Sequence, residues 1–401
     1  MNLLYFILNT LQYILLIYIG ISSLYFFLYA FAAQFSRKKV VSTSDKKHKF
    51  LVLIPGYKED QVIVDVATEA LKQDYPKDLY DIIVIADSFK LETLNNLKKL
   101  PIIVNEVSFE VSSKSKSINA TLAAIPNNKY NAIMILDADN IMESNVLSLM
   151  NEALNSGYSA VQGHRVAKNT DMPFARLDAI SEEINNCIFR RGHRALGVSS
   201  ALIGSGMAFE YNIYKNYMAT IDSYGEDKEL EFKLMKDNIK IEFIDEAWIY
   251  DEKVSASKVF VRQRTRWLFN QILYARLYFF EGVKLLLTKG NFDFFDKMFQ
   301  QFLPPRILLI GISFLSALGS FFYNSIELTY IFVGIFISTI AAFSMAVPKR
   351  FYNFKTMKVL LLLPKGFVLM IMSLLRLQEA KKGFGATTHT VTKINNDKNN
   401  N

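Results

Sequence analysis

Acidic and hydrogen-bonding side chains stand directly after three apolar segments of this sequence. They are Tyr57, Glu59, Asp87, Asp137 and Asp139. Asp137 and Asp139 are one residue apart, so their charges repel each other unless a cation lies between them or on one of them. Oxygen ligands of this kind select Mg²⁺ or Mn²⁺. A solvated turn rich in Asp explains the pair equally well when it is taken alone.

Glu226 and Asp227 open a predicted helix over 228–236. An acid in the first turn of a helix is stabilised by the helix dipole, so a capping role is the simplest interpretation. The functional alternative is a general base that takes a proton from a hydroxyl group.

Gln263, Arg266 and Trp267 lie in an amphipathic, aromatic segment at 259–280. Arg and Trp often anchor a helix at a membrane surface. A guanidinium group can also neutralise a departing diphosphate, and an indole offers a flat platform for a sugar ring. Both interpretations stay open at this point.

Several other kinds of site are excluded by the sequence. It contains neither a G-x-x-x-x-G-K-[ST] loop nor a G-x-G-x-x-G turn. The short Gly204-Ser205-Gly206 string is best explained as a tight bend. One Cys and four scattered His residues cannot form a disulfide framework or a closely spaced zinc site.

Four continuous apolar runs predict strands that are buried on both faces. They are 50–54, 82–86, 102–104 and 133–136. The segments 62–72 and 93–100 suit helices that cross between parallel strands. The sequence therefore predicts an α/β domain with a mostly parallel sheet, and ligands bind beyond the carboxyl ends of such strands.

Apolar segments near both ends of the chain predict membrane helices. Residues 1–36 carry no charge and are long enough to cross a bilayer, and the basic residues that follow place the next segment in the cytosol. The runs 307–323 and 328–347 predict a hairpin that leaves and re-enters the cytosol. The run 359–375 contains Pro364-Lys365, and a Lys at the bilayer centre costs about 3 kcal/mol, so an interfacial or re-entrant helix is preferred to a further span.

The net charge of +8 argues for a membrane rather than a nucleic acid as partner. Residues 348–401 hold ten basic and two acidic side chains, and the charges before them balance. A basic segment that directly follows a membrane helix is typical of a membrane-adjacent region. We therefore expect no nucleic-acid partner.

The motifs in this order resemble those of the membrane-embedded family 2 glycosyltransferases. The matching motifs are Pro-x-Tyr-x-Glu, Asp87, Lys114 with Asn119, Asp-x-Asp, Gly-x-Gly, Glu-Asp and Gln-x-x-Arg-Trp. The family includes cellulose, hyaluronan and poly-N-acetylglucosamine synthases and, more distantly, ceramide glucosyltransferase. The resemblance covers about residues 50–270. Single motifs of this kind are weak evidence, whereas seven in sequence are strong.

The resemblance implies a GT-A type nucleotide-sugar-binding domain flanked by transmembrane and interfacial helices. It implies that a UDP-sugar donor is held by Tyr57, Glu59, Asp87, Lys114, Asp137, Gln263, Arg266 and Trp267. Asp139 would bind Mg²⁺ or Mn²⁺, and Asp227 would be the general base, with Glu226 beside it in the catalytic pair. Phe384 to His389 resembles a gating-loop motif, although Phe384 replaces the usual Trp and Lys58 replaces an Asn common in the first motif.

The expected organisation has six parts. They are an N-terminal transmembrane helix (1–36), a cytosolic GT-A domain (37–257), interfacial helices with the Gln-x-x-Arg-Trp motif (258–303), a transmembrane hairpin (304–347), a basic interfacial or re-entrant helix (348–380), and a gating-loop-like motif with a disordered tail (381–401).

The resemblance implies an inverting, metal-dependent hexosyltransferase that extends a cell-surface or capsule polysaccharide. The alternative is a transferase that adds one sugar to a membrane lipid, as ceramide glucosyltransferase does. A sensor that binds nucleotide-sugars without turnover would need a broken catalytic acid, and a soluble nucleotidyltransferase would not explain the membrane helices. We expect an integral protein of a bacterial inner (plasma) membrane with a cytosolic catalytic domain, and oligomerisation is left open.

Overall fold

A mixed eight-stranded sheet forms the centre of the chain. The computed structural model describes residues 3–36, 44–223, 225–253, 257–322, 326–377, 391–392 and 394. The strands are β1 (Phe50–Tyr57), β2 (Tyr80–Asp87), β3 (Ile103–Val107), β4 (Ala132–Ile135), β5 (Ile141–Met142), β6 (Ala160–Ala167), β7 (Met207–Glu210) and β8 (Ile241–Asp251). Their order is β3-β2-β1-β4-β7-β6-β8-β5, with β7 antiparallel to both neighbours and β5 antiparallel to β8. The predicted α/β fold with a mostly parallel sheet is confirmed.

Strand β1 shows why the apolar runs are continuous. Phe50, Val52 and Ile54 belong to the core on one face of the sheet. Leu51 and Leu53 belong to the core on the other face. Because successive side chains of a strand point to opposite faces, a strand covered on both sides must be apolar at every position.

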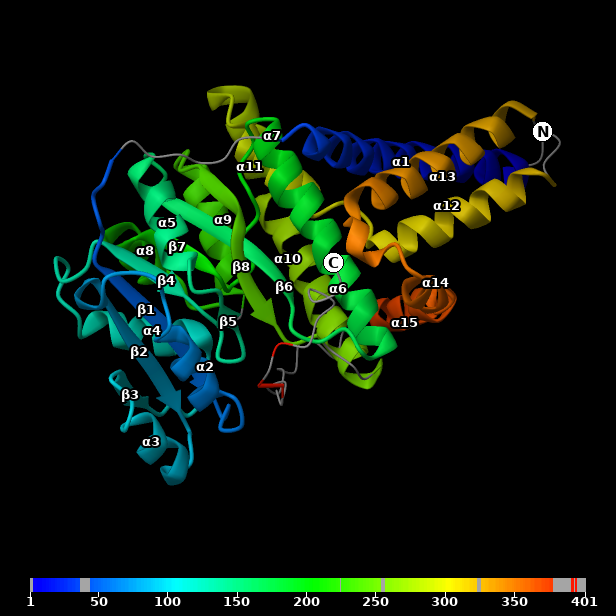
Figure 1. Cartoon of the computed structure of the whole chain (residues 1–401). Helices are drawn as coiled ribbons and strands as arrows, with labels where there is room; N and C mark the ends of the chain where they lie inside the picture. Colours follow the sequence, from blue (N-terminus) through cyan, green and yellow to red (C-terminus); the bar gives the residue numbers. More distant parts are fainter. Residues whose placement is uncertain are drawn as a thin grey trace.

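Helices cover both faces of this sheet (Figure 1). They are η1 (Lys77–Leu79), α2 (Ile63–Ala70), α3 (Leu91–Leu97), α4 (Lys114–Ala123), α5 (Val146–Asn155), α6 (Pro173–Asn185), the π-helix η2 (Asn186–Gly192), α7 (His193–Ala195), α8 (Tyr211–Met218) and α9 (Glu226–Lys236). The crossover helices predicted at 62–72 and 93–100 correspond to α2 and α3. The helix predicted at 228–236 begins two residues earlier, at Glu226.

The remaining helices form a second layer beside the sheet. They are α1 (Leu3–Gln34), α10 (Ser257–Lys289), α11 (Phe292–Gln300), α12 (Arg306–Ser320), α13 (Ile326–Ala346), η3 (Lys349–Phe351), α14 (Phe354–Leu360) and α15 (Leu363–Leu375). Helices α1, α12 and α13 pack together and project away from the sheet, with α14 and α15 near their base (Figure 1). Their shared apolar core also includes Cys187 and Ile188 of η2, so this bundle packs directly on the sheet domain.

Two helices of the described segments are long and apolar enough to cross a membrane, within Phe6–Gln34 and Ile326–Ala346. Helices α14 and α15 are bent by 45° and together form either a broken span or a re-entrant loop, which would bring the number to three. Helix α12 has 15 residues and is therefore only about 22 Å long. This is shorter than the ~30 Å hydrocarbon core. The two to three long apolar helices indicate membrane association, and the crossing predicted for 307–323 stays a prediction.

Candidate active site

The ends of β1, β2 and β4 bring the first group of predicted residues to one edge of the sheet. These three strands are parallel neighbours, so their carboxyl ends lie side by side. Tyr57 and Asp87 are direct register partners at the ends of β1 and β2. Asp87 is buried and accepts a hydrogen bond of 2.9 Å from Ser88 Oγ, whereas Tyr57 is partly exposed. Glu59 follows two residues after Tyr57 and is nearly buried.

Lys114, at the start of α4, connects the acidic residues that follow β4 with those that open α9. Its Nζ donates to Asp137 Oδ1 and, over 2.7 Å, to the carbonyl oxygen of Gly204. The same Nζ lies 3.4 Å from Glu226 Oε1. Asp137 and Glu226, 89 positions apart along the chain, are therefore held by one ammonium group.

The charges around Lys114 are unbalanced towards the acids. Burial raises the pKa of Glu226 to about 7; Lys114 opposes this shift, and the nearby charges of Asp227 and Asp137 add to it. Burial alone would lower the pKa of Lys114, but Asp137 and Glu226 raise it overall, so the lysine stays charged. Three carboxyl groups thus share one cation, which is the kind of environment found at functional sites.

Asp227 lies at the same point, next to Gly204. A methyl group added at Gly204 would lie 3.6 Å from Asp227 Oδ2 and 3.7 Å from Lys114 Nζ. Gly204 has φ +83° and Gly206 has φ +66°, a backbone conformation that side-chain-bearing residues rarely adopt. The Gly204-Ser205-Gly206 string is therefore the predicted tight bend, and it also forms one wall of the site.

Helix α10 brings the Gln-x-x-Arg-Trp motif towards the start of α9. Tyr274 Oη donates over 3.1 Å to the carbonyl oxygen of Gly225, the residue before Glu226. Trp267 lies seven residues before Tyr274, on the same face of the helix. Its ring is partly exposed and is covered on one side by the guanidinium of Arg264, 4.1 Å from the ring centre.

Gln263, one turn before Trp267 on α10, has a side-chain oxygen that is buried and accepts no hydrogen bond from any group in the described part of the chain. Such an orphaned acceptor is costly unless a ligand or water satisfies it. Arg266 is half-buried on the same helix.

Asp139 is held in place by a short chain of buried hydrogen bonds. Its Oδ1 accepts from Asn140 Nδ2 over 2.9 Å, and its Oδ2 accepts from the Glu252 N–H over 3.2 Å. Asn140 Oδ1 in turn accepts from Ser205 Oγ over 2.7 Å, and Ser205 Oγ accepts from the Asp137 N–H over 2.9 Å. Both residues of the Asp-x-Asp pair are thereby fixed by the Gly-Ser-Gly bend.

These residues fit a divalent cation whose other ligands come from a substrate. Within the described ranges no three His, Cys, Asp or Glu side chains gather as a closed metal cage. Mg²⁺ is commonly bound by one or two carboxylates together with substrate phosphates rather than by a closed cage. Carboxylate ligands are usually held by outer hydrogen bonds such as those of Asn140 and the Glu252 N–H.

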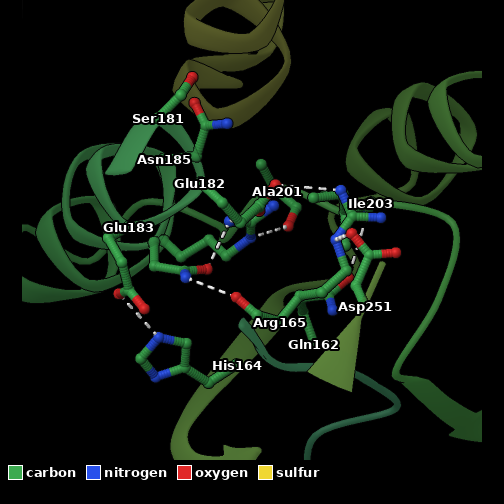
Figure 2. Close-up of polar contacts among 12 residues, drawn as sticks. Gln162, His164, Arg165, Ser181, Glu182, Glu183, Asn185, Ala201, Ile203 and Asp251 are labelled. Atoms are coloured by element: carbon green, nitrogen blue, oxygen red, sulfur yellow. Dashed lines mark hydrogen bonds and ion pairs between the residues drawn. The ribbon is translucent and has the colours of Figure 1, made fainter. Parts of the chain in front are cut away.

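Arg165, Glu182 and Asp251 belong to a buried ionic network next to Asn140 (Figure 2 shows these three residues). Arg165 of β6 lies 3.0 Å from Glu182 of α6 and 3.7 Å from Asp251 at the end of β8. Lys253 lies 2.6 Å from Asp251, and Asn140 Nδ2 donates to Asp251 over 3.1 Å. Burial would raise the pKa of the Asp251 carboxyl, but Arg165 and Lys253 lower it overall. The network therefore links Asp139, through Asn140, to the interior of the domain.

The structure brings Lys114, Asp137, Glu226 and Asp227 into one cluster and places Tyr57, Glu59, Asp87 and Asp139 at the same edge of the sheet. Gln263, Arg266 and Trp267 lie on the neighbouring helix α10. The gating-loop-like motif from Phe384 to His389 lies outside the described residues. Sequence reasoning did not single out Asn140 or the buried network; the position of Asn140 directly after Asp-Ala-Asp was the one available signal for it.

Comparisons with known proteins identify the family of this chain. The model of the family described as "Glycosyltransferase like family 2" matches residues 48–270. A probable glycosyltransferase, YdaM of Bacillus subtilis (strain 168), is 25% identical over 268 residues, which cover 64% of this chain. The match spans 63% of that relative's length.

Two solved structures are also similar. The mannosyltransferase PcManGT from Pyrobaculum calidifontis has a TM-score of 0.50 at 13% identity, covering 84% of this chain and 97% of that one. The structure of S. aureus TarS 1-349 has a TM-score of 0.41 at 15% identity, covering 83% and 91%. The first of these likenesses supports the GT-A fold, and the second adds nothing to that argument.

The family match covers more than half of the chain and includes the strand-end acids and the helix that starts at Glu226. The chain belongs to glycosyltransferase family 2, and its sheet domain has the GT-A fold.

Proposed function

We propose that the chain is an inverting membrane transferase that moves a sugar from a UDP-sugar to a growing cell-surface polysaccharide. The observation that carries this proposal is the position of Asp227 beside Gly204 and Lys114, where Lys114 also binds Asp137. A base is thereby held next to the loop expected to bind the donor.

The reaction needs an activated hydroxyl and a stabilised leaving group. Asp227 takes the proton from the acceptor hydroxyl, whose oxygen then attacks the anomeric carbon as the bond to the diphosphate breaks. General base catalysis of this kind typically contributes about 10²- to 10⁴-fold. A single displacement inverts the configuration of the anomeric carbon.

The leaving diphosphate carries charge that must be neutralised. Arg266 and the side-chain NH₂ of Gln263 are the groups of α10 expected to donate to it. The Gln263 oxygen is buried and has no hydrogen-bond partner among the described residues, so it can accept from a sugar hydroxyl of the substrate. Asp139 would hold Mg²⁺ or Mn²⁺, which supplies Lewis-acid stabilisation of the diphosphate when bound. PcManGT was solved with GDP-Man and Mn²⁺, which supports a metal here and makes a GDP-sugar the competing donor.

The second candidate is a transferase that adds one sugar to a membrane lipid. It is favoured by the small number of helices that could span a membrane, two or at most three in the described segments. So few helices make a thin wall for a channel that would carry a polymer.

Turnover screening tests both candidates. The full-length protein in nanodiscs is offered a panel of radiolabelled UDP-sugars and GDP-mannose, with Mg²⁺ or with Mn²⁺, and the products are separated by size. We expect metal-dependent transfer from a UDP-sugar. A long polymer supports the first candidate, a single lipid-mobile product supports the second, and transfer from GDP-mannose alone would contradict the UDP assignment.

A further inference from the structure

Two adjacent residues of α11 bind opposite parts of the molecule. Asp296 contacts the apolar helix α1, and Lys297 contacts α9, the helix that begins with Glu226 and Asp227. Both side chains are 3% exposed, so neither interaction is a loose surface contact. We call Asp296 and Lys297 the α11 link.

On the side of α1, Asp296 accepts hydrogen bonds from two tyrosine hydroxyls. Tyr25 and Tyr29 donate to its Oδ1 over 2.9 and 3.1 Å. Gln300 Nε2 donates to its Oδ2 over 2.8 Å, and His193 Nε2 lies 3.0 Å from the same oxygen. The two tyrosine hydroxyls are thus hydrogen-bonded to a buried carboxylate, on a helix that carries no charged residue.

The position of α1 at this contact is fixed by close packing. A methyl group added at Gly192 of η2 would lie 2.2 Å from the backbone oxygen of Tyr29, which leaves no room for a side chain. The ring of Tyr29 also stacks on His193 with ring centres 3.8 Å apart. Helix α1 therefore packs on η2 and α7 in one well-defined position.

On the side of α9, Lys297 pairs with a fully buried carboxylate. Its Nζ lies 2.7 Å from Glu231 Oε1, and Lys228 Nζ lies 3.0 Å from Glu231 Oε2. The Leu202 N–H also donates to Glu231 Oε1 over 3.1 Å. Glu231 thus ties together α9, α11 and the segment that leads into the bend at Gly204.

Glu231 lies one turn after Asp227 on α9, on the same side of the helix. Leu202 lies two residues before Gly204, the residue that faces Asp227. A single buried carboxylate therefore holds both the helix that carries Asp227 and the loop opposite it. A displacement of Lys297 would therefore move both α9 and the loop at Gly204, which form two walls of the site.

We infer that the α11 link and Glu231 are positioning residues. Through them, the placement of Asp227 depends on how α1 packs against η2, α7 and α11. This inference rests on the proposed function, in which Asp227 is the base. It identifies the anchor helix as part of the catalytic framework as well as an attachment to the membrane.

The first test removes the hydroxyls of Tyr25 and Tyr29 from full-length protein in nanodiscs. In the double variant Tyr25→Phe/Tyr29→Phe, we expect kcat for transfer to fall about 10- to 100-fold, because small displacements of catalytic groups have effects of this size. The KM for the donor and the binding of UDP are expected to stay unchanged.

A matched control is available on the same helix. Tyr18 Oη donates over 2.9 Å to the carbonyl oxygen of Phe302, outside the α11 link. Tyr18→Phe removes the same chemical group from the same helix, and we expect it to keep the wild-type kcat.

The second test breaks the link on its other side. Lys297→Met combined with Glu231→Gln removes both charges of this pair together. Lys228 loses its carboxylate partner but keeps its hydrogen bond of 2.9 Å to the carbonyl oxygen of Leu202. We expect the same fall in kcat with unchanged UDP binding, which also reports that the domain is folded. The control is Lys236→Met with Glu281→Gln, a more exposed pair of 2.6 Å that also joins α9 to the second layer.

Three results separate the possibilities. Wild-type kcat in both double variants would overturn the inference, and so would a loss of UDP binding in parallel with kcat, because the residues would then be merely structural. If wild-type protein itself transfers no sugar from any donor, the proposed function fails, whatever the variants do.

Discussion

Two charged clusters of this domain have opposite balances of charge. Around Lys114, the three acids Asp137, Glu226 and Asp227 share one cation. In the network behind Asp139, two acids face three cations. The acids are Glu182 and Asp251, and the cations are Arg165, Arg190 and Lys253.

The difference between the clusters is that the acids around Lys114 outnumber their cation, whereas each acid of the network has a cation partner. In the network, neighbouring cations lower the pKa of Asp251 against the effect of burial, so both acids stay ionised and paired. At Lys114, burial raises the pKa of Glu226 to about 7. We therefore expect substitutions at Lys114 and its acids to change the reaction, and substitutions in the network to change stability.

Asp227→Asn is expected to have the largest effect on the reaction. Removing a general base should lower kcat by about 10²- to 10⁴-fold, and UDP binding should persist because the amide keeps the shape of the carboxylate. Turnover and equilibrium UDP binding of the purified protein check this. Wild-type turnover would show that Asp227 is not the base.

Glu182→Gln should instead lower the free energy of unfolding of the domain. Its carboxylate lies 3.0 Å from Arg165 and 3.3 Å from Arg190, so the substitution removes one charged partner from each of two buried guanidinium groups. Removing one member of a buried pair typically costs about 3–5 kcal/mol. Thermal or denaturant unfolding measures the loss. A stability equal to that of Asp227→Asn would contradict the division between the two clusters.

The pH dependence of stability should reveal the raised pKa of Glu226. Its pKa is about 7 in the folded protein, against 4.5 for a glutamate free of such surroundings, so the folded state binds its proton more tightly than the unfolded state. The contribution to stability is full below pH 4.5 and is lost as the pH rises through about 7, at up to ~1.4 kcal/mol per pH unit. Glu226→Gln should flatten this part of the curve relative to wild type. If the curves of stability against pH were parallel for the two proteins, folding would not raise the pKa of Glu226.

Trp267→Ala should have the smallest effect and the most selective one. The partly exposed ring is expected to face the acceptor sugar, and aromatic contacts of this kind are worth about 0.5–1.5 kcal/mol, or about 2- to 13-fold. Transfer should fall more than hydrolysis of the donor. An equal loss of both activities would indicate that Trp267 only supports the packing of α10.

The sequence was sufficient for the strands whose local pattern is decisive. The runs that became β1, β2 and β4 are apolar at every position because both faces are covered, and the acids after them mark the strand ends. Strands β5, β6, β7 and β8 were not predicted, because their pairing is decided by distant strands rather than by a local period.

The features of the site also divide into those that the sequence predicts and those that depend on tertiary packing. The residues of the motifs could be predicted, but the contact of Lys114 with Gly204 and Glu226 depends on how the sheet brings α4 and α9 together. Arg165, Glu182 and Asp251 could not be found, because charged residues in a sequence are normally assigned to the surface. Only tertiary packing pairs them in the interior.

The two hydroxyls of α1 also constrain how the chain is made. Tyr25 is synthesised long before its acceptor exists, because Asp296 follows it by 271 residues. At the usual ~5–20 residues per second of synthesis, this interval is roughly 15 to 55 s. During that time water or lipid head groups must satisfy both hydroxyls, so α1 can dock onto α11 only after Asp296 has been synthesised.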